Sequence, residues 1–402
     1  MIQDKLRQVY GLDKYGSKIP EWTEDLKYEF VKEVIGNKIY EAREWINNMN
    51  KILEELKDKV NVKGWIFSRE MTSFIKDPYR HLVKKLFIYF HDLLRGRITV
   101  EEFITKGKQA INSSFSSNMR SIYQIWGFSS IILLLGDYGF NVVYPEHKYL
   151  NFDRSGKQKL GIIPPNVVLQ RLSSAFSFFL EAPRPIAWED GSDLERVWRL
   201  YSTLRPDMMI YRGFQIDILD LENSDIPIKR PSYILEFKEL DNWWKRWRYL
   251  KEYKPLSGNE WRARWIKGLY NGLVEVLNKL PEDLPDFKDS KSKRIREYEI
   301  IYLYNNIYKP KDKGVLASRV TVSEEIKTKI NNEIMVIDNI AFNYNKFEDL
   351  VDDMLRGNVV GKGEVDVTRL AYKFALERKD EFLKWLKNQG IDNIDLSNDF
   401  NY

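Results

Sequence analysis

The sequence predicts an α/β protein in which helices flank a mixed β-sheet, with an N-terminal helical domain and a small C-terminal α+β appendage. Apolar residues recur at helical spacing through roughly the first 110 residues. Short apolar runs of strand type then alternate with helical patterns, and a polar break over 309–314 precedes the last part of the chain. We therefore expect domains at 1–114, 115–310 and 311–402.

The N-terminal part has the periodicity of amphipathic helices. Its clearest apolar stripe consists of Ile39, Trp45, Ile46, Met49, Ile52, Leu53 and Leu56. Further helices are predicted over 78–95, where Asp77 and Pro78 form a start signal, and over 99–113. Because this part carries no catalytic motif, we expect a helical cap or an interaction domain through which the chain forms a homodimer or binds a partner subunit.

The middle of the chain contains short apolar runs with the length and composition of β-strands. They are 140–144, 166–169, 208–211, 233–237 and 298–304. An insertion over 147–204 holds two such runs, 167–172 and 176–180, which we expect to form a hairpin beside the cleft. Beyond the polar break, we predict one more strand near 334–337 and a helix over 367–388.

Composition excludes several classes of protein. The chain has 402 residues, 43% of them hydrophobic and 31% charged, which is enough to form a large core. It has no cysteine, so a disulfide scaffold, a thiol nucleophile and an iron–sulfur cluster are excluded. The net charge of +5 is too small for this length to indicate nucleic acid by itself. No signal-like segment opens the sequence, so we expect a cytoplasmic protein, and abundant Lys, Glu, Ile and Tyr suit a thermophile.

Histidine chemistry is also disfavoured. The three histidines, His81, His91 and His147, are isolated from one another and lack the spacing of a zinc motif. No Gly-x-Ser-x-Gly elbow occurs, and so few histidines make a Ser/His/Asp hydrolase a poor fit. Any catalytic centre should therefore be built from carboxylates and cations.

Two acidic residues and a lysine form the informative constellation. Pro206 and Asp207 directly precede one apolar run, and Glu236 and Lys238 lie at the end of the next. Side chains alternate along a strand, so Glu236 and Lys238 should project to the same side. If the strand that follows Asp207 pairs alongside, Asp207 and Glu236 can bind one divalent cation.

This arrangement suits hydrolysis of a phosphodiester bond. Asp207 and Glu236 would hold Mg²⁺ or Mn²⁺, and the carbonyl of Phe237 would add a ligand. The cation polarises the phosphate and lowers the pKa of a bound water. Lys238 would orient or deprotonate that water and stabilise the developing charge. From the residues alone, a surface salt bridge remains the ordinary alternative.

These residues resemble the motif of the PD-(D/E)xK nuclease superfamily. Pro206, Asp207, Glu236 and Lys238 match that motif position by position. The resemblance covers roughly 115–305 and implies a restriction-endonuclease-like mixed sheet flanked by helices, with the acids and the lysine on adjacent strands. It also implies a helix before the first core strand, often with a Glu or Gln that faces the metal.

A helix of that kind is found in the expected place. Tyr123, Gln124 and Trp126 lie before the apolar run at 140–144, and their stretch looks like the Tyr-Glu-x-Trp helix of McrC-like restriction nuclease subunits. Gln124 stands where those relatives usually have Glu. The resemblance therefore implies a catalytic role for Gln124 with one fewer acidic ligand, or a contact mediated by water. A plain buried helix is the alternative.

A basic and aromatic stretch follows the second motif directly. Over 243–267 the chain carries eight Lys or Arg against two Glu, with seven aromatic residues interleaved. We expect the phosphates of DNA, with RNA as the alternative, to be contacted by Lys245, Arg246, Arg248, Lys251, Arg262 and Arg264. The tryptophans would stack on bases or pack inward, since Trp243 and Trp247 are four residues apart, as are Trp261 and Trp265.

The sequence therefore predicts a Mg²⁺-dependent endo- or exodeoxyribonuclease that acts by direct attack of water. Two alternatives stay open: a catalytically silent protein that binds nucleic acid on the same scaffold, and an assembly subunit in which the acid and the lysine form an ordinary ion pair. Five further acids would lie on the surface or assist the site: Glu181, Asp190, Glu195, Asp217 and Asp220.

Overall fold

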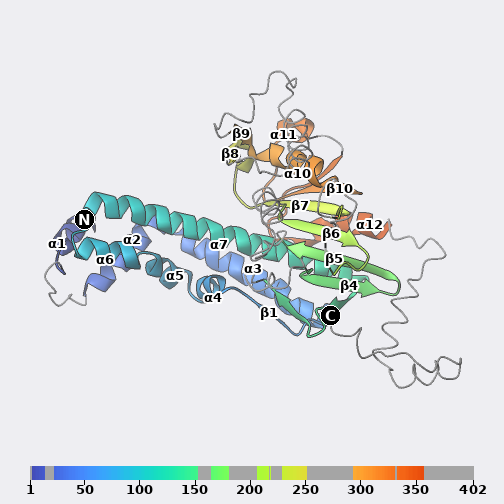
Figure 1. The fold of residues 1–402 in the computed structure, drawn as a ribbon, viewed down its shortest axis with the longest axis horizontal. Helices are drawn as coiled ribbons and strands as arrows, with labels where there is room; N and C mark the ends of the chain where they lie inside the picture. The colour runs from blue at the N-terminus through green and yellow to red at the C-terminus, as the bar shows by residue number, and fades with distance from the viewer. Residues whose placement is uncertain are drawn as a thin grey trace, which may run out of the picture.

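The computed structural model describes residues 2–13, 22–152, 164–180, 206–216, 218, 229–250, 293–330 and 333–356. It shows an elongated arm of helices joined to a twisted sheet (Figure 1). In these parts of the chain, no helix combines the length and the apolar character needed to cross a bilayer.

The arm is built from the N-terminal helices, which gather along one long helix (Figure 1). They are α1 (Ile2–Val9), α2 (Trp22–Ile35), α3 (Lys38–Lys59), α4 (Arg69–Lys76), α5 (Pro78–Lys85), α6 (Phe87–Leu94) and α7 (Val100–Asp137). The apolar stripe predicted over 39–56 is the buried face of α3. The start signal is also confirmed, because the Asp77 side chain accepts a hydrogen bond from the backbone N–H of Arg80 at the beginning of α5.

Helix α7 connects the arm to the sheet and corrects the expected domain boundary. It begins at a capping box formed by Thr99 and Glu102 and continues for 38 residues, about 57 Å at 1.5 Å per residue. The boundary expected between residues 114 and 115 falls inside this helix, so it is wrong. Every residue from Ile122 to Leu135 is buried, as in a helix that passes through a core. The helix predicted over 78–95 is likewise two helices, α5 and α6.

Seven of the described strands form one sheet in the order β11-β10-β7-β6-β5-β4-β2. They are β2 (Asn141–Tyr144), β4 (Val167–Arg171), β5 (Ser174–Leu180), β6 (Met208–Arg212), β7 (Tyr233–Lys238), β10 (Lys313–Ser318) and β11 (Ile334–Ile337). Within this sheet, β2, β4, β5, β6 and β7 pair antiparallel, whereas β7, β10 and β11 pair parallel, so the sheet is mixed as predicted. Two short strands, β1 (Gly64–Ile66) and β3 (Tyr149–Asn151), pair separately.

The predicted hairpin is present, but its position differs from the expectation. Strands β4 and β5 are joined by a tight turn and lie between β2 and β6 as interior strands of the sheet. Every residue from Ala175 to Leu180 is buried. An interior strand is covered on both faces, which explains why this run is continuously apolar instead of alternating.

The run at 298–304 is a helix, so the strand predicted there is wrong. A 3₁₀ turn, η4 (Glu297–Glu299), leads into α10 (Ile300–Tyr308). Ile300, Ile301, Tyr304 and Tyr308 are fully or almost fully buried, which is the spacing of a helix face. A short apolar run cannot by itself distinguish a buried strand from a buried helix.

The expected C-terminal appendage is also corrected, because its first half belongs to the core. Strands β10 and β11 extend the main sheet, and α10 and α11 (Glu324–Lys329) precede them. Beyond β11, η5 (Tyr344–Phe347) leads into α12 (Glu348–Arg356). A polar chain secures α12: Arg212 donates to the Tyr233 hydroxyl at 2.7 Å, and that hydroxyl donates to Asp353 at 2.9 Å. The helix predicted over 367–388 lies outside the described residues.

The sheet divides the described core into two layers. On one face, Tyr233, Leu235 and Phe237 of β7 belong to the apolar cluster that contains α7. On the other face, Ile234 belongs to the cluster that contains α10. This alternation determines the direction of every side chain at the end of β7, where the motif residues lie.

Candidate active site

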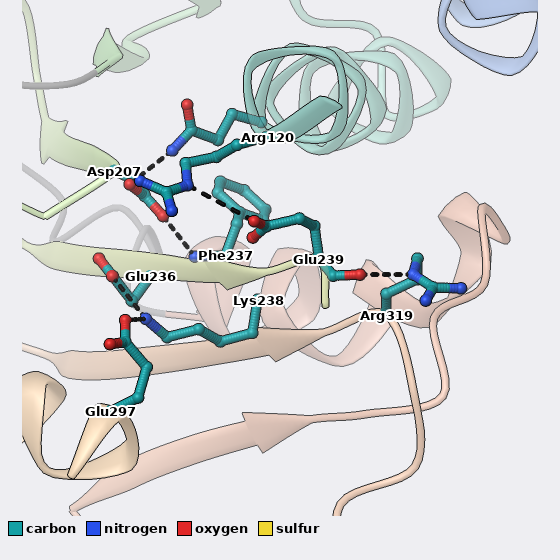
Figure 2. A network of polar contacts seen from close by, with 9 residues as sticks. Arg120, Asp207, Glu236, Phe237, Lys238, Glu239, Glu297 and Arg319 are labelled. Atoms are coloured by element: carbon teal, nitrogen blue, oxygen red, sulfur yellow. Dashed lines mark hydrogen bonds and ion pairs between the residues drawn. The ribbon is translucent and has the colours of Figure 1, made fainter. Parts of the chain in front are cut away.

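Asp207 lies immediately before β6, at the point where β6 and β7 stop pairing. The last paired positions on this side are Met208 and Leu235, so the antiparallel register places Asp207 opposite Glu236. The carboxylate turns toward β7, and its Oδ2 accepts a hydrogen bond from the backbone N–H of Phe237 at 2.8 Å (Figure 2). The first acid of the motif is therefore attached to the strand that carries the second acid and the lysine.

Glu236 and Lys238 project from the same face of β7, as predicted from strand alternation. Each is only 4% exposed, and Lys238 Nζ donates to Glu236 Oε1 at 2.9 Å (Figure 2). A buried ion pair of this kind is stable only when its charges are well matched by partners. The residues of a surface salt bridge are exposed to solvent. Because Glu236 and Lys238 are buried, this pair is not a surface salt bridge.

Phe237, between them, points to the opposite face and packs against α7. Its ring lies edge-on to Tyr123, with the ring centroids 6.2 Å apart. At Gly127 of α7, an added Cβ would come within 2.4 Å of the Phe237 ring. Only glycine allows this close approach between helix and strand. The packing fixes β7 against α7 at the level of the motif.

Gln124 makes direct contact with the site. It is 1% exposed, and its Nε2 donates to Asp207 Oδ1 at 2.6 Å. Its Oε1 is buried and has no hydrogen-bond partner within the described residues. The hydroxyl of Tyr123, the preceding residue, is also buried without a hydrogen-bond partner within the described residues, and burial raises the pKa of that phenol, so it stays neutral. The helix predicted from the resemblance therefore supplies a partner for the first acid.

Glu297, which the sequence did not single out, completes the polar cluster. Its Oε1 accepts from Lys238 Nζ at 2.6 Å (Figure 2). The backbone N–H of Glu297 donates to the carbonyl of Arg246 at 3.0 Å, which fastens η4 to the segment that follows β7. Acidic residues favour the first turn of a helix, so Glu297 and Glu299 before an apolar run were a signal for this helix start.

A second polar cluster lies at the very end of β7. Arg319 donates from Nε to the backbone carbonyl of Glu239 at 2.6 Å, and its guanidinium lies 5.1 Å from the centre of the Trp45 ring of α3. The carboxylate of Glu239 points toward Arg120 of α7, with 3.5 Å between Nε and Oε1 (Figure 2). These contacts connect the end of β7 to the helical arm, and no sequence pattern indicated them.

The structure describes the beginning of the basic stretch, and two of its tryptophans there lie in different environments. Trp243, in η2 (Trp243–Lys245), is 1% exposed and donates from Nε1 to Ser318 Oγ at 2.9 Å. Its ring lies 5.7 Å from Lys238 Nζ. Trp247 is 44% exposed, and the Arg296 guanidinium lies 3.9 Å from the centre of its ring. Trp243 therefore packs inward, while Trp247 lies at the surface.

Only some of the residues predicted to contact phosphate lie within the described parts of the chain. Lys245 and Arg246 are exposed. Arg248 lies in β8 (Trp247–Leu250), which pairs antiparallel with β9 (Lys293–Arg296) as a separate ribbon near α10 (Figure 1). Outside the described residues lie Lys251, Arg262 and Arg264, and with them Glu181, Asp190, Glu195, Asp217 and Asp220.

The donors at the motif fit Mg²⁺ or Mn²⁺ in chemical type. Asp207 and Glu236 offer hard carboxylate oxygens. In an extended strand the N–H and C=O of one residue point to the same side, so the Phe237 carbonyl faces the edge where its N–H meets Asp207. Within the described residues no three His, Asp or Glu side chains are grouped so as to hold an ion alone. A cation bound here would keep several waters, as Mg²⁺ usually does.

Comparison with known proteins does not assign the chain to a family. No family model, no curated protein and no solved structure matches it. The resemblance to the PD-(D/E)xK nucleases therefore depends on the motif residues and on their positions at the ends of two adjacent strands.

Proposed function

We propose that the chain is a metal-dependent nuclease that hydrolyses DNA phosphodiester bonds by direct attack of water. One observation carries the proposal: Asp207 bonds to the backbone of Phe237, the residue between Glu236 and Lys238. Two acids and a lysine from adjacent strands are thereby gathered at one place, where Glu236 and Lys238 are buried and Asp207 is partly buried. The surrounding α/β architecture supports a restriction-endonuclease-like core, with α7 and α10 on opposite faces of the sheet.

Each residue has a defined task in this proposal. Asp207 and Glu236 hold the Mg²⁺ or Mn²⁺ ion together with the carbonyl of Phe237. When bound, the ion polarises the phosphate and acidifies a water molecule. Lys238 places its ammonium beside the attacked phosphate and stabilises the negative charge that develops there. Gln124 orients the carboxylate of Asp207 through the 2.6 Å hydrogen bond from its amide.

Exposed cations next to the site support a nucleic-acid substrate. Lys245 and Arg246 are exposed and follow the lysine of the motif within eight residues. The Arg246 carbonyl accepts from the N–H of Glu297, so this basic segment is held directly beside the polar cluster. We include Arg248, Lys251, Arg262 and Arg264 in the same proposed phosphate-binding stretch, because cations that neutralise phosphates release counterions and strengthen binding.

A silent scaffold is the second candidate, and one observation favours it. The ammonium of Lys238 is held by two carboxylates, Glu236 and Glu297, as in an ordinary buried ion network. A protein of this kind would bind nucleic acid or assemble with a partner without turnover. The two candidates differ in one property, because only the nuclease needs a divalent cation.

The substrate class is tested by incubating the protein with linear and circular, single- and double-stranded DNA and with RNA. Each substrate is offered with Mg²⁺, with Mn²⁺ and with a chelator. The nuclease proposal expects cleavage with metal and none with chelator, and the substrates that are cut define the class. Salt-dependent binding without cleavage under any of these conditions would favour the silent scaffold.

A further inference from the structure

Lys238 is held by two carboxylates that come from distant parts of the chain. Glu236 lies two residues before it on the same strand, and Glu297 lies 59 residues after it in η4. The contact to Glu297 is the shorter of the two, at 2.6 Å against 2.9 Å. The side chain of Glu297 is 20% exposed, and those of Glu236 and Lys238 are each 5% exposed. All three charges therefore interact in a poorly solvated environment, where charge–charge interactions are strong.

The charges at the motif suggest which carboxylate holds Lys238 and which carboxylates are left for the cation. Asp207, Glu236 and Glu297 are three carboxylates, and Lys238 is one ammonium, which leaves two negative charges among these four groups. One divalent cation neutralises them. If Glu236 alone held Lys238, the ammonium and the cation would compete for the same carboxylate. A separate carboxylate for Lys238 removes that competition.

We propose that Glu297 is a positioning residue that holds Lys238, so that the carboxylates of Asp207 and Glu236 can bind the divalent cation. The inference rests on the proposed function and assigns to η4 a part in the same site. Glu297 acts through Lys238 and does not contact the cation.

The backbone around Glu297 is built to hold this carboxylate in place. Its N–H donates to the Arg246 carbonyl at 3.0 Å, and Arg296 donates from Nη1 to the Lys245 carbonyl at 3.0 Å. Glu299 accepts from the N–H of Arg296 and closes the first turn. Three hydrogen bonds thus fix η4, and a carboxylate carried on a fixed turn can determine where a flexible lysine places its ammonium.

The test is a double-mutant cycle in which Mn²⁺ affinity of the full chain is measured by calorimetry. The four proteins are the wild type, Glu297→Gln, Lys238→Met and the double variant. Loss of Glu297 should weaken Mn²⁺ binding about tenfold when Lys238 is present, and less than about twofold when it is replaced. Cleavage by Glu297→Gln should recover at high Mn²⁺ concentration, which a merely structural defect would not allow.

Two further variants keep the experiment decisive. Glu297→Asp retains the charge and should retain most of the Mn²⁺ affinity, even if Glu297→Gln folds poorly. Glu325→Gln removes one carboxylate that pairs with Lys329 on the exposed face of α11 and should leave the affinity unchanged.

Each remaining outcome counts against the inference. Equal losses in both backgrounds would mean that Glu297 acts on the cation directly, and no loss in either would mean that it has no part in binding. If the wild type itself takes up no Mn²⁺, the proposed function fails and the inference fails with it.

Discussion

Gln124 donates a 2.6 Å hydrogen bond to Asp207 and joins two residues that are 83 positions apart in the chain. The donor lies on α7 and the acceptor at the start of β6. Gln124 is 1% exposed, so the contact is shielded from water, and a hydrogen bond to a charged group contributes about 1.5–3 kcal/mol. The long helix of the arm therefore takes part in the site as well as in the core.

Gln124→Glu should make stability depend on metal. The substitution places a second carboxylate at the same position beside Asp207, and two like charges this close destabilise the fold by about 1–3 kcal/mol without a cation. A divalent cation should restore that stability and bind more tightly than in the wild type. Thermal unfolding with chelator and with Mg²⁺ measures both effects.

The matched control is Asn112→Asp, which makes the same amide-to-acid change on an exposed turn of α7. It should not alter the response to metal. If Gln124→Glu is equally stable with chelator and with metal, Gln124 does not face a cation site.

Asp207→Ala should abolish stabilisation by metal. A ligand at 100 times its Kd stabilises a protein by about 2.7 kcal/mol, and that gain disappears when the site is lost. Melting curves with and without Mn²⁺ measure it, with Asp349→Ala, at an exposed position of α12, as the control. An equal metal response in wild type and Asp207→Ala would place the metal elsewhere.

Joint replacement of Lys245, Arg246 and Arg248 by Ala should weaken DNA binding more than it affects stability. Each phosphate contact contributes about 0.9 to the slope of log affinity against log salt on duplex DNA. Loss of three contacts should therefore flatten the slope by about two to three units, as measured by titration at several salt concentrations.

A triple variant in the helical arm has the same charge change and serves as control: Lys32, Lys106 and Lys108 replaced by Ala, all exposed. It should leave the slope almost unaltered. An unchanged slope in the first variant would show that the segment after β7 does not contact phosphate.

His81 should make the arm sensitive to acid. Burial lowers the pKa of this histidine, which lies 3.2 Å from Ser114 Oγ and packs on Phe74. As the pH falls below the unfolded-state value of about 6.5, the unfolded chain takes up a proton that the folded chain does not. Stability should therefore fall by up to about 1.4 kcal/mol per pH unit until the folded-state pKa is reached.

Denaturant unfolding of the wild type and of His81→Asn between pH 7.5 and pH 5 measures this contribution. The variant should show a weaker dependence on pH in that range. Identical dependences would mean that His81 has the same pKa in the folded and the unfolded chain, so that it contributes nothing to the pH dependence of stability.

Local patterns predicted the parts of the site that depend on one strand. The common side of Glu236 and Lys238 follows from the two-residue period of β7, and Asp207 was placed beside them by assuming that the two runs pair. Gln124 was found through the resemblance, but its direct bond to Asp207 requires the position of α7 across the sheet. Glu297 joins the cluster through tertiary structure alone, so no pattern around the motif indicated it.

The helix predicted over 99–113 continues to Asp137 as α7, and there is a specific physical reason why the sequence did not indicate this. Ser113, Ser114, Ser116, Ser117 and Asn118 form a polar run that indicates a break between two helices. In the fold, Asn118 donates to the backbone carbonyl of Ser114 at 2.8 Å, and Ser114 contacts His81 of α5. These partners satisfy polar groups inside the arm, which local propensity does not reveal.

The most direct test of the central claim compares cleavage by the wild type with cleavage by Glu236→Gln. This variant keeps the shape of the side chain and removes the charge that the cation requires. The nuclease account predicts metal-dependent cleavage of DNA by the wild type and a loss of at least about 100-fold in the variant, with both proteins folded by circular dichroism. Equal cleavage by the two proteins, or none by the wild type with Mg²⁺ or Mn²⁺, would contradict it.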